Sequence, residues 1–74
     1  MARSSVEVMV SAADLYEATQ QYDEFAQTLG LIVQRSDSPE TIADTYVRMG
    51  NLSKGHLNQP EQAPGYYRKA LDAF

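Results

Sequence analysis

Apolar residues recur every three or four positions through the first half of the chain, which is the spacing of one face of an α-helix. The stripe consists of Val8, Ala12, Leu15, Ala18, Tyr22, Phe25, Leu29 and Ile32. The pattern predicts one long amphipathic helix over about residues 5–35, or an initial turn followed by a helix from about Ser11, and it fits both. Gly30 is unfavourable there by about 1 kcal/mol relative to alanine. We therefore expect either a close backbone approach at Gly30 or an early end of the helix.

A second helix is predicted to begin at Pro39. Ser38 is a favoured N-cap residue, and proline at the first helical position lacks an N–H that would be unpaired there. One face of this helix carries Ile42, Tyr46, Met49 and Leu52, and another aligns Glu40, Asp44 and Arg48 at i, i+4 spacing. The helix should end at Lys54-Gly55, where glycine can adopt the left-handed conformation that closes a helix.

Two prolines four positions apart divide the next segment. Pro60 and Pro64 do not both fit inside one helix. We expect Pro60 to belong to a turn only, and a third helix to run from about Pro64 to Ala73. The apolar stripe of this helix is Tyr67, Ala70, Leu71 and Phe74.

These elements predict a single all-α domain over residues 1–74, built as an antiparallel helical hairpin or three-helix bundle with a long first helix. A chain of 74 residues buries only about 60% of the surface that its unfolded form exposes. It contains no cysteine, so neither a disulfide nor a thiolate metal site reinforces its core. Stability must therefore come from close helix packing and, we expect, from a partner.

The second and third predicted helices resemble a tetratricopeptide repeat over about residues 46–71. The matching pattern is Tyr46-x-x-Met49-Gly50 followed by Ala63-x-x-x-Tyr67-x-x-Ala70-Leu71. An internal echo displaced by 20 to 21 positions is also typical of stacked helical units. The resemblance implies that Gly50 and Ala63 lie where two helices cross closely. It also implies a protein-binding or assembly module without catalytic residues.

A second resemblance is to acyl carrier proteins. The chain is small, acidic and helical, and Asp37-Ser38 lies near its middle, ahead of an acidic helix. This resemblance implies an acyl or peptidyl carrier modified with a phosphopantetheine arm at Ser38. Because an N-cap followed by proline explains the same residues without chemistry, the carrier function is the alternative to an interaction module.

No complete catalytic, cofactor or metal-binding signature is present in the sequence. His56 is the only histidine, which leaves too few ligands for a zinc site. The formal net charge of −4 argues against nucleic acid and anionic membranes as ligands. Glu7 interrupts the apolar run near the N-terminus, and no stretch approaches the roughly 20 apolar residues of a membrane span. We expect a cytoplasmic protein that is not an enzyme and binds no cofactor, metal, nucleic acid or membrane.

The tyrosines and the stripe of the third helix indicate an interface. Tyrosine combines a large apolar ring with a polar tip, and Tyr66 and Tyr67 lie on different helix faces, so we expect one ring to face outward. If Tyr67 and Leu71 pack inward, Tyr66 and Phe74 lie near the edge. The predicted partner-binding residues are Tyr66, Tyr67, Leu71 and Phe74.

Charge is divided unevenly along the chain. Residues 1–47 carry eight acidic and two basic residues, a net charge of −6, whereas residues 48–74 carry +2. Solvated helix faces explain this division, and so does an acidic half that binds a basic partner or the basic half of a second molecule. The sequence predicts a non-enzymatic protein–protein interaction module, such as an adaptor, small chaperone or assembly subunit. We expect it to self-associate as a homodimer or to bind another protein.

Overall fold

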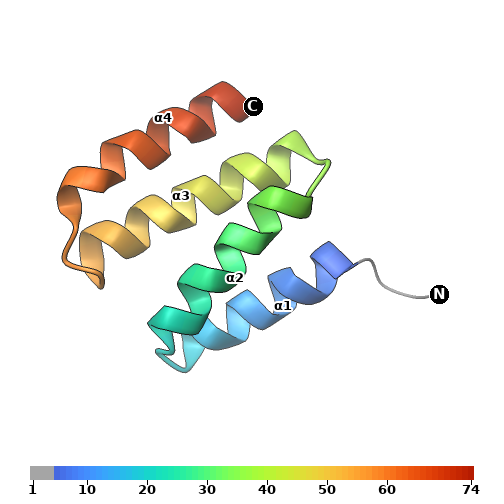
Figure 1. Cartoon of the computed structure of the whole chain (residues 1–74), viewed down its shortest axis with the longest axis horizontal. Coiled ribbons are helices and arrows are strands. Elements are labelled where there is room, and N and C mark those ends of the chain that lie inside the picture. The colour runs from blue at the N-terminus through green and yellow to red at the C-terminus, as the bar shows by residue number, and fades with distance from the viewer. Residues whose placement is uncertain (1–4) are drawn as a thin grey trace.

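Four α-helices make up most of the computed structural model, which describes residues 5–74 (Figure 1). They are α1 (Ser5–Ala18), α2 (Tyr22–Arg35), α3 (Pro39–Gly55) and α4 (Ala63–Ala73), with a short 3-10 helix, η1 (Pro60–Gln62), before α4. No strand occurs among the described residues, so the predicted all-α class is confirmed. Arg3, one of the two bases counted in the acidic half, lies outside them.

The predicted long first helix is wrong, because the chain turns sharply between α1 and α2. Gln20 has a φ of 61°, in the left-handed region. The Gln21 N–H donates to Tyr16 O at 2.8 Å, and the Gln20 N–H donates to Glu17 O at 3.2 Å. These two bonds form a Schellman motif, which usually has glycine at the left-handed position. The glutamine explains why the sequence pattern conceals the break.

The turn changes which face of α1 is buried. Val8 and Leu15, both assigned to the apolar stripe, are 53% and 61% exposed. Met9, Ala13 and Tyr16 instead face the core, at the same helical spacing but on a different side of the helix. Because α1 folds back onto α2, its inward face is set by the direction of the turn rather than by a continuous helix.

The core is one cluster shared by three helices. It consists of Ala13 from α1, Phe25, Leu29 and Ile32 from α2, and Leu52 from α3. Both expectations for Gly30 are wrong, because α2 continues to Arg35 and a Cβ at Gly30 would meet nothing within 4 Å.

The predicted start of α3 is confirmed and its predicted ending only in part. Ser38 is the N-cap, and its Oγ accepts a hydrogen bond from the Thr41 N–H at 3.3 Å. The helix ends at Gly55 as expected, but no described glycine has a positive φ. Asn58 takes the left-handed conformation instead, with a φ of 53°. Like Gln20, it is a residue without the steric freedom of glycine.

Helix α4 packs antiparallel to α3 at a close crossing. It begins one residue before the predicted Pro64, and Pro60 lies in η1 rather than in α4. A Cβ at Gly50 would lie only 2.5 Å from the Tyr67 ring, so glycine is needed for this approach. The Tyr67 hydroxyl also donates a hydrogen bond of 2.6 Å to Oδ1 of Asn51, the residue that follows Gly50.

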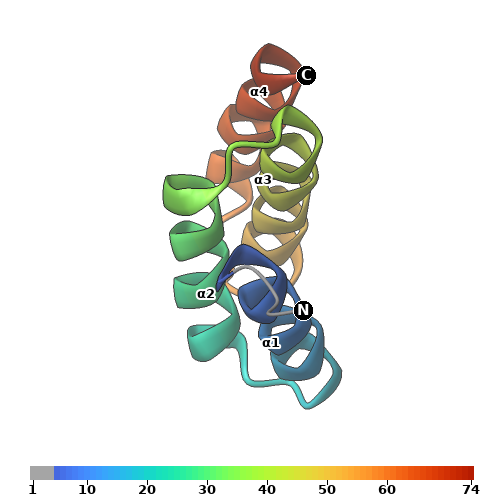
Figure 2. The same cartoon turned by 90° about the vertical axis from the view of Figure 1, so that its right-hand side faces the viewer.

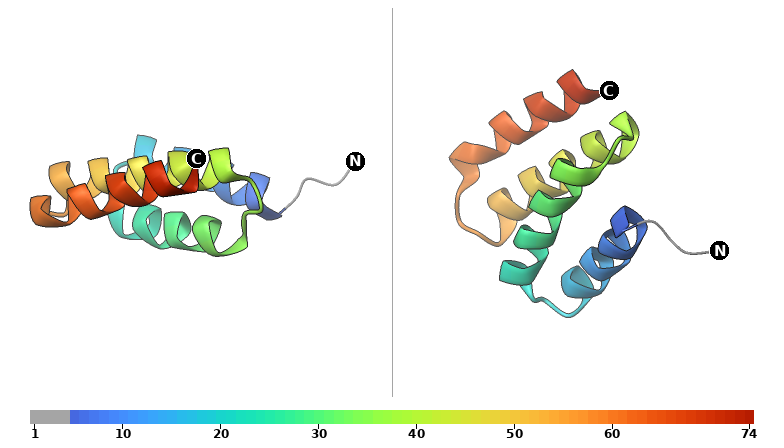
Figure 3. Two further views of the ribbon diagram at one scale, coloured as in Figure 1. Left: turned by 90° about the horizontal axis from the view of Figure 1, so that it is seen from above. Right: turned by 45° about the vertical axis from the view of Figure 1, so that its right-hand side comes forward.

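The helices form a flat body in which α3 lies between α2 and α4. The Cα atoms span 41 × 29 × 14 Å. Helix α1 packs on α2, α2 packs on α3, and α4 packs on α3 and η1 (Figures 2 and 3). Each outer helix therefore has one large face that no other helix covers.

Arg48 joins α3 to both preceding helices. Its guanidinium lies 2.9 Å from Asp14 Oδ1 and 3.1 Å from Glu17 Oε1, with the guanidinium carbon 5.0 Å from the centre of the Phe25 ring. Asp44 and Arg48 are aligned at i, i+4 spacing, but Arg48 forms its ion pairs with Asp14 and Glu17 instead. Its side chain is only 17% exposed.

We predict that Ser38→Ala lowers the free energy of unfolding by about 1 kcal/mol, because the Thr41 N–H loses its cap. Chemical denaturation of the two proteins measures this difference. Partner binding at saturating concentration should be unchanged. Lost binding with unchanged stability would instead indicate chemistry at Ser38.

Two glycine substitutions should have opposite signs. Gly50→Ala should destabilise by about 1–3 kcal/mol, because the added methyl group overlaps the Tyr67 ring. Gly30→Ala should stabilise by about 0.5–1 kcal/mol, because it gains helix propensity without a clash. Thermal or urea unfolding of both variants provides the test. Equal effects would mean that α3 and α4 do not cross closely at Gly50.

Arg48→Ala should destabilise by about 2–3 kcal/mol, because two charge-assisted contacts and the packing over Phe25 are lost together. Arg35→Ala removes an exposed arginine from α2 and should change stability by less than about 0.5 kcal/mol. Denaturation curves measured in parallel compare the two. Similar losses for both would contradict the bridging role of Arg48.

Candidate functional site

An apolar groove lies between α3 and α4 and is the most promising binding surface of the described part of the chain. Its volume is about 360 Å³. It is lined by Ala43 and Val47 from α3 and by Tyr67, Ala70, Leu71 and Phe74 from α4. No charged side chain lines it, so the groove suits an apolar surface rather than an ion or a polar metabolite.

The groove exists because α4 has only one neighbouring helix. Ala63 and Ala70 are buried against α3, whereas Leu71 and Phe74 are 81% and 79% exposed. Val47 is also exposed on the α3 side. An isolated exposed leucine is ordinary, but several large apolar side chains around one hollow are typical of an interaction site.

Three of the four predicted partner-binding residues line this groove: Tyr67, Leu71 and Phe74. Phe74 lies at the edge, as expected. The expectation that Leu71 packs inward is wrong, because α4 turns its small residues toward α3 and leaves Leu71 outside. A close crossing needs small side chains, so Ala70 takes the inward position.

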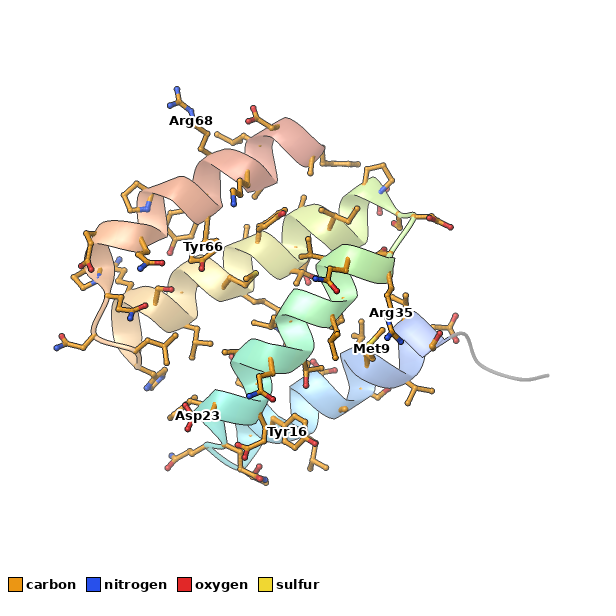
Figure 4. The ribbon with its side chains drawn as sticks, in the orientation of Figure 1. Met9, Tyr16, Asp23, Arg35, Tyr66 and Arg68 are labelled. Carbon is orange, nitrogen blue, oxygen red and sulfur yellow. The ribbon has the colours of Figure 1, made fainter. Side chains whose placement is uncertain are left out.

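Tyr66, labelled in Figure 4, does not line the groove and instead borders a separate hollow together with Lys69. The Lys69 Nζ is 5.9 Å from the centre of its ring and 5.7 Å from the centre of the Tyr46 ring. Neither Tyr66 nor Tyr67 is fully exposed. Tyr67 packs against Gly50, and the Tyr66 ring, with Lys69 beside it, is partly exposed. The expectation that one of the two rings faces outward stays a prediction.

Sequence reasoning missed Ala43 and Val47, although a signal for them exists. Together with Gly50 they recur at i, i+4 and i+7 and form a second apolar edge on α3. The stronger stripe from Ile42 to Leu52 obscured it.

Ser38 and His56, the other candidate residues, make contacts within the fold. The Ser38 hydroxyl is engaged at the start of α3. The His56 ring stacks on Tyr22, with ring centres 4.0 Å apart and planes inclined by 13°. Within residues 5–74 no group of three or more histidine, cysteine, aspartate or glutamate side chains is placed to hold a metal ion. In the same range, no helix has the length and apolar character required to traverse a membrane.

Comparisons with known proteins return no relative. No family model matches the chain, and neither the curated proteins nor the solved structures yield a significant match. The resemblances to tetratricopeptide repeats and to acyl carrier proteins thus stay predictions. The case for a function depends on the geometry of the groove.

Proposed function

We propose that this protein is a non-enzymatic protein–protein interaction module, acting as an adaptor, small chaperone or assembly subunit, with the α3–α4 groove as its docking surface. The observation that carries the proposal is the exposure of Leu71 and Phe74 beside Val47 around one apolar hollow. A cytoplasmic location is part of the proposal.

The exposed side chains are large enough to contribute substantially to binding. Burial of a leucine or phenylalanine contributes about 1.5–3 kcal/mol, so Leu71 and Phe74 together supply about 3–6 kcal/mol. A micromolar complex requires a net binding free energy of about 8 kcal/mol, and the contacts must in addition offset the entropic cost of association, on the order of 4 kcal/mol or more. Contacts with Val47 and Tyr67 and polar contacts at the rim can supply the remainder.

The resemblance to a tetratricopeptide repeat agrees with this function. In such proteins each helical hairpin stacks against a neighbour, and a single hairpin leaves one face uncovered. The α3–α4 hairpin has a close crossing at Gly50 and an uncovered apolar edge at Leu71. A docked partner would take the place of the missing neighbour.

The carrier alternative has no such support. The Ser38 hydroxyl caps α3, and this structural role accounts for the serine and for the proline that follows it. Incubation with a phosphopantetheinyl transferase followed by mass spectrometry separates the two functions. A mass increase at Ser38 would favour the carrier.

We predict that Leu71→Asp reduces partner capture at least about ten-fold, because it places a charge in the apolar groove. Leu15→Asp is the matched control, since Leu15 is also largely exposed but lies on α1. Tagged wild type and variants are purified from the native host, and the bound proteins are quantified by mass spectrometry. Both variants should keep the wild-type melting temperature. Equal capture by all three proteins would contradict the groove as docking surface.

A further inference from the structure

We infer that the α3–α4 groove docks against the same groove of a second copy of this chain, with the helices of the two copies antiparallel. This inference rests on the groove being the docking surface proposed above. It specifies the partner as the chain itself, and the arrangement as a four-helix contact of α3 and α4 with their symmetry-related equivalents.

The charge pattern of α3 is the first argument. Glu40, Val47 and Lys54 follow one another at intervals of seven residues, so all three lie along nearly the same edge of the helix. Glu40 and Lys54 are exposed, opposite in charge and about 21 Å apart along the axis, too far to pair with each other. A two-fold axis at the level of Val47 places Glu40 opposite Lys54 of the second copy, and Lys54 opposite its Glu40.

Helix α4 carries two opposite charges, one on each side of the level of Val47 and at equal distances from it. Arg68 and Asp72 are both exposed and lie two residues before and two residues after Ala70. Tyr67 lies against Gly50 and the two helices are antiparallel, so Ala70 lies at about the level of Val47, and both line the groove. The axis that pairs Glu40 with Lys54 therefore also brings Arg68 to the level of Asp72 of the second copy. Figure 4 shows Arg68 projecting from α4 away from α3.

The alternative symmetric arrangement, with the two-fold axis along the helices, is disfavoured by charge. The contact of Gly50 with Tyr67 defines which residues of α3 and α4 lie side by side. Since α3 and α4 run antiparallel, Asp72 lies near the level of Asp44. An axis along the helices would bring Asp72 close to Asp44 of the second copy, which is a repulsive contact.

Within residues 5–74 no ion pair involves Glu40, Lys54, Arg68 or Asp72. The basic residue of α3 that does pair within the fold is Arg48, with Asp14 and Glu17. A symmetric contact also buries Leu71 and Phe74 twice, once from each copy, and closes on itself. A contact between the groove and the exposed Val8 and Leu15 of another copy would be open-ended and would leave the pattern around Val47 unexplained.

Charge inversion tests the symmetry directly. The variants are Glu40→Lys and Lys54→Glu, and sedimentation velocity measures their mass over a concentration series. Each variant alone should dimerise at least about ten-fold more weakly than wild type, because both reciprocal pairs become repulsive. An equimolar mixture of the two should regain wild-type dimerisation, since both pairs in the mixed dimer are attractive. The double variant Glu40→Lys/Lys54→Glu should also dimerise.

Two controls isolate the groove. Asp23→Lys and Arg35→Glu invert exposed charges on α2, away from α4 (Figure 4), and should leave dimerisation unchanged. Leu71→Asp should abolish the dimer over the measured range. Circular dichroism of every variant should show the wild-type helix content, so that weaker association reflects the interface rather than unfolding.

The outcomes separate this inference from the proposed function. Restored association in the mixture supports the antiparallel dimer. A wild-type protein that stays monomeric overturns it, while the proposed function stands if Leu71→Asp still loses another captured protein. A dimer that is insensitive to both charge inversions overturns the arrangement. Assemblies that grow beyond a dimer with concentration point instead to the open-ended contact through α1.

Discussion

Three helices of this protein meet at one small apolar cluster, and the rest of the fold is built outward from it. Ala13, Phe25, Leu29, Ile32 and Leu52 form the cluster. A chain of this size buries a comparatively small share of its surface, and its large apolar residues Leu71 and Phe74 stay outside this cluster. Helix α4 contributes no residue to the cluster, so its position depends on the separate crossing at Gly50 and Tyr67.

This dependence explains why the candidate site is next to α4. Close approach to α3 requires small residues on the inward side, and α4 provides Ala63 and Ala70 there. Its larger apolar residues, Leu71 and Phe74, are left on the outside. The constraint that stabilises the hairpin thus also creates an apolar edge that a partner can cover. The stability of the hairpin and the exposure of this apolar edge are two consequences of the same one-sided packing.

The uneven charge of the chain has an internal role at Arg48. This arginine belongs to the basic half and contacts Asp14 and Glu17 of the acidic half. Part of the acidic charge is therefore matched within the fold by a side chain that also packs over Phe25. Four of the exposed charges along α3 and α4, namely Glu40, Lys54, Arg68 and Asp72, have the symmetric arrangement on which the inferred dimer rests. The ion pairs within the fold and the contacts of the inferred dimer thus use different residues.

Local chemistry along the sequence determined the helical class, the start of α3 at Ser38-Pro39, the limits of α4 to within one residue, and the close approach at Gly50. Each depends on a residue type with a strong local preference: a capping hydroxyl, a proline, or a glycine without a side chain. Three of the four predicted partner-binding residues also share one groove for this reason, since a helical stripe is a local pattern. Only the tertiary structure decided the break at Gln20, the buried face of α1 and the outward position of Leu71. A glutamine in the left-handed conformation has no local signature, and an apolar residue can face either way until the neighbouring helix is placed. The sequence therefore determined where the helices lie along the chain to within a few residues, whereas long-range packing decided which of their faces became the core and which stayed exposed.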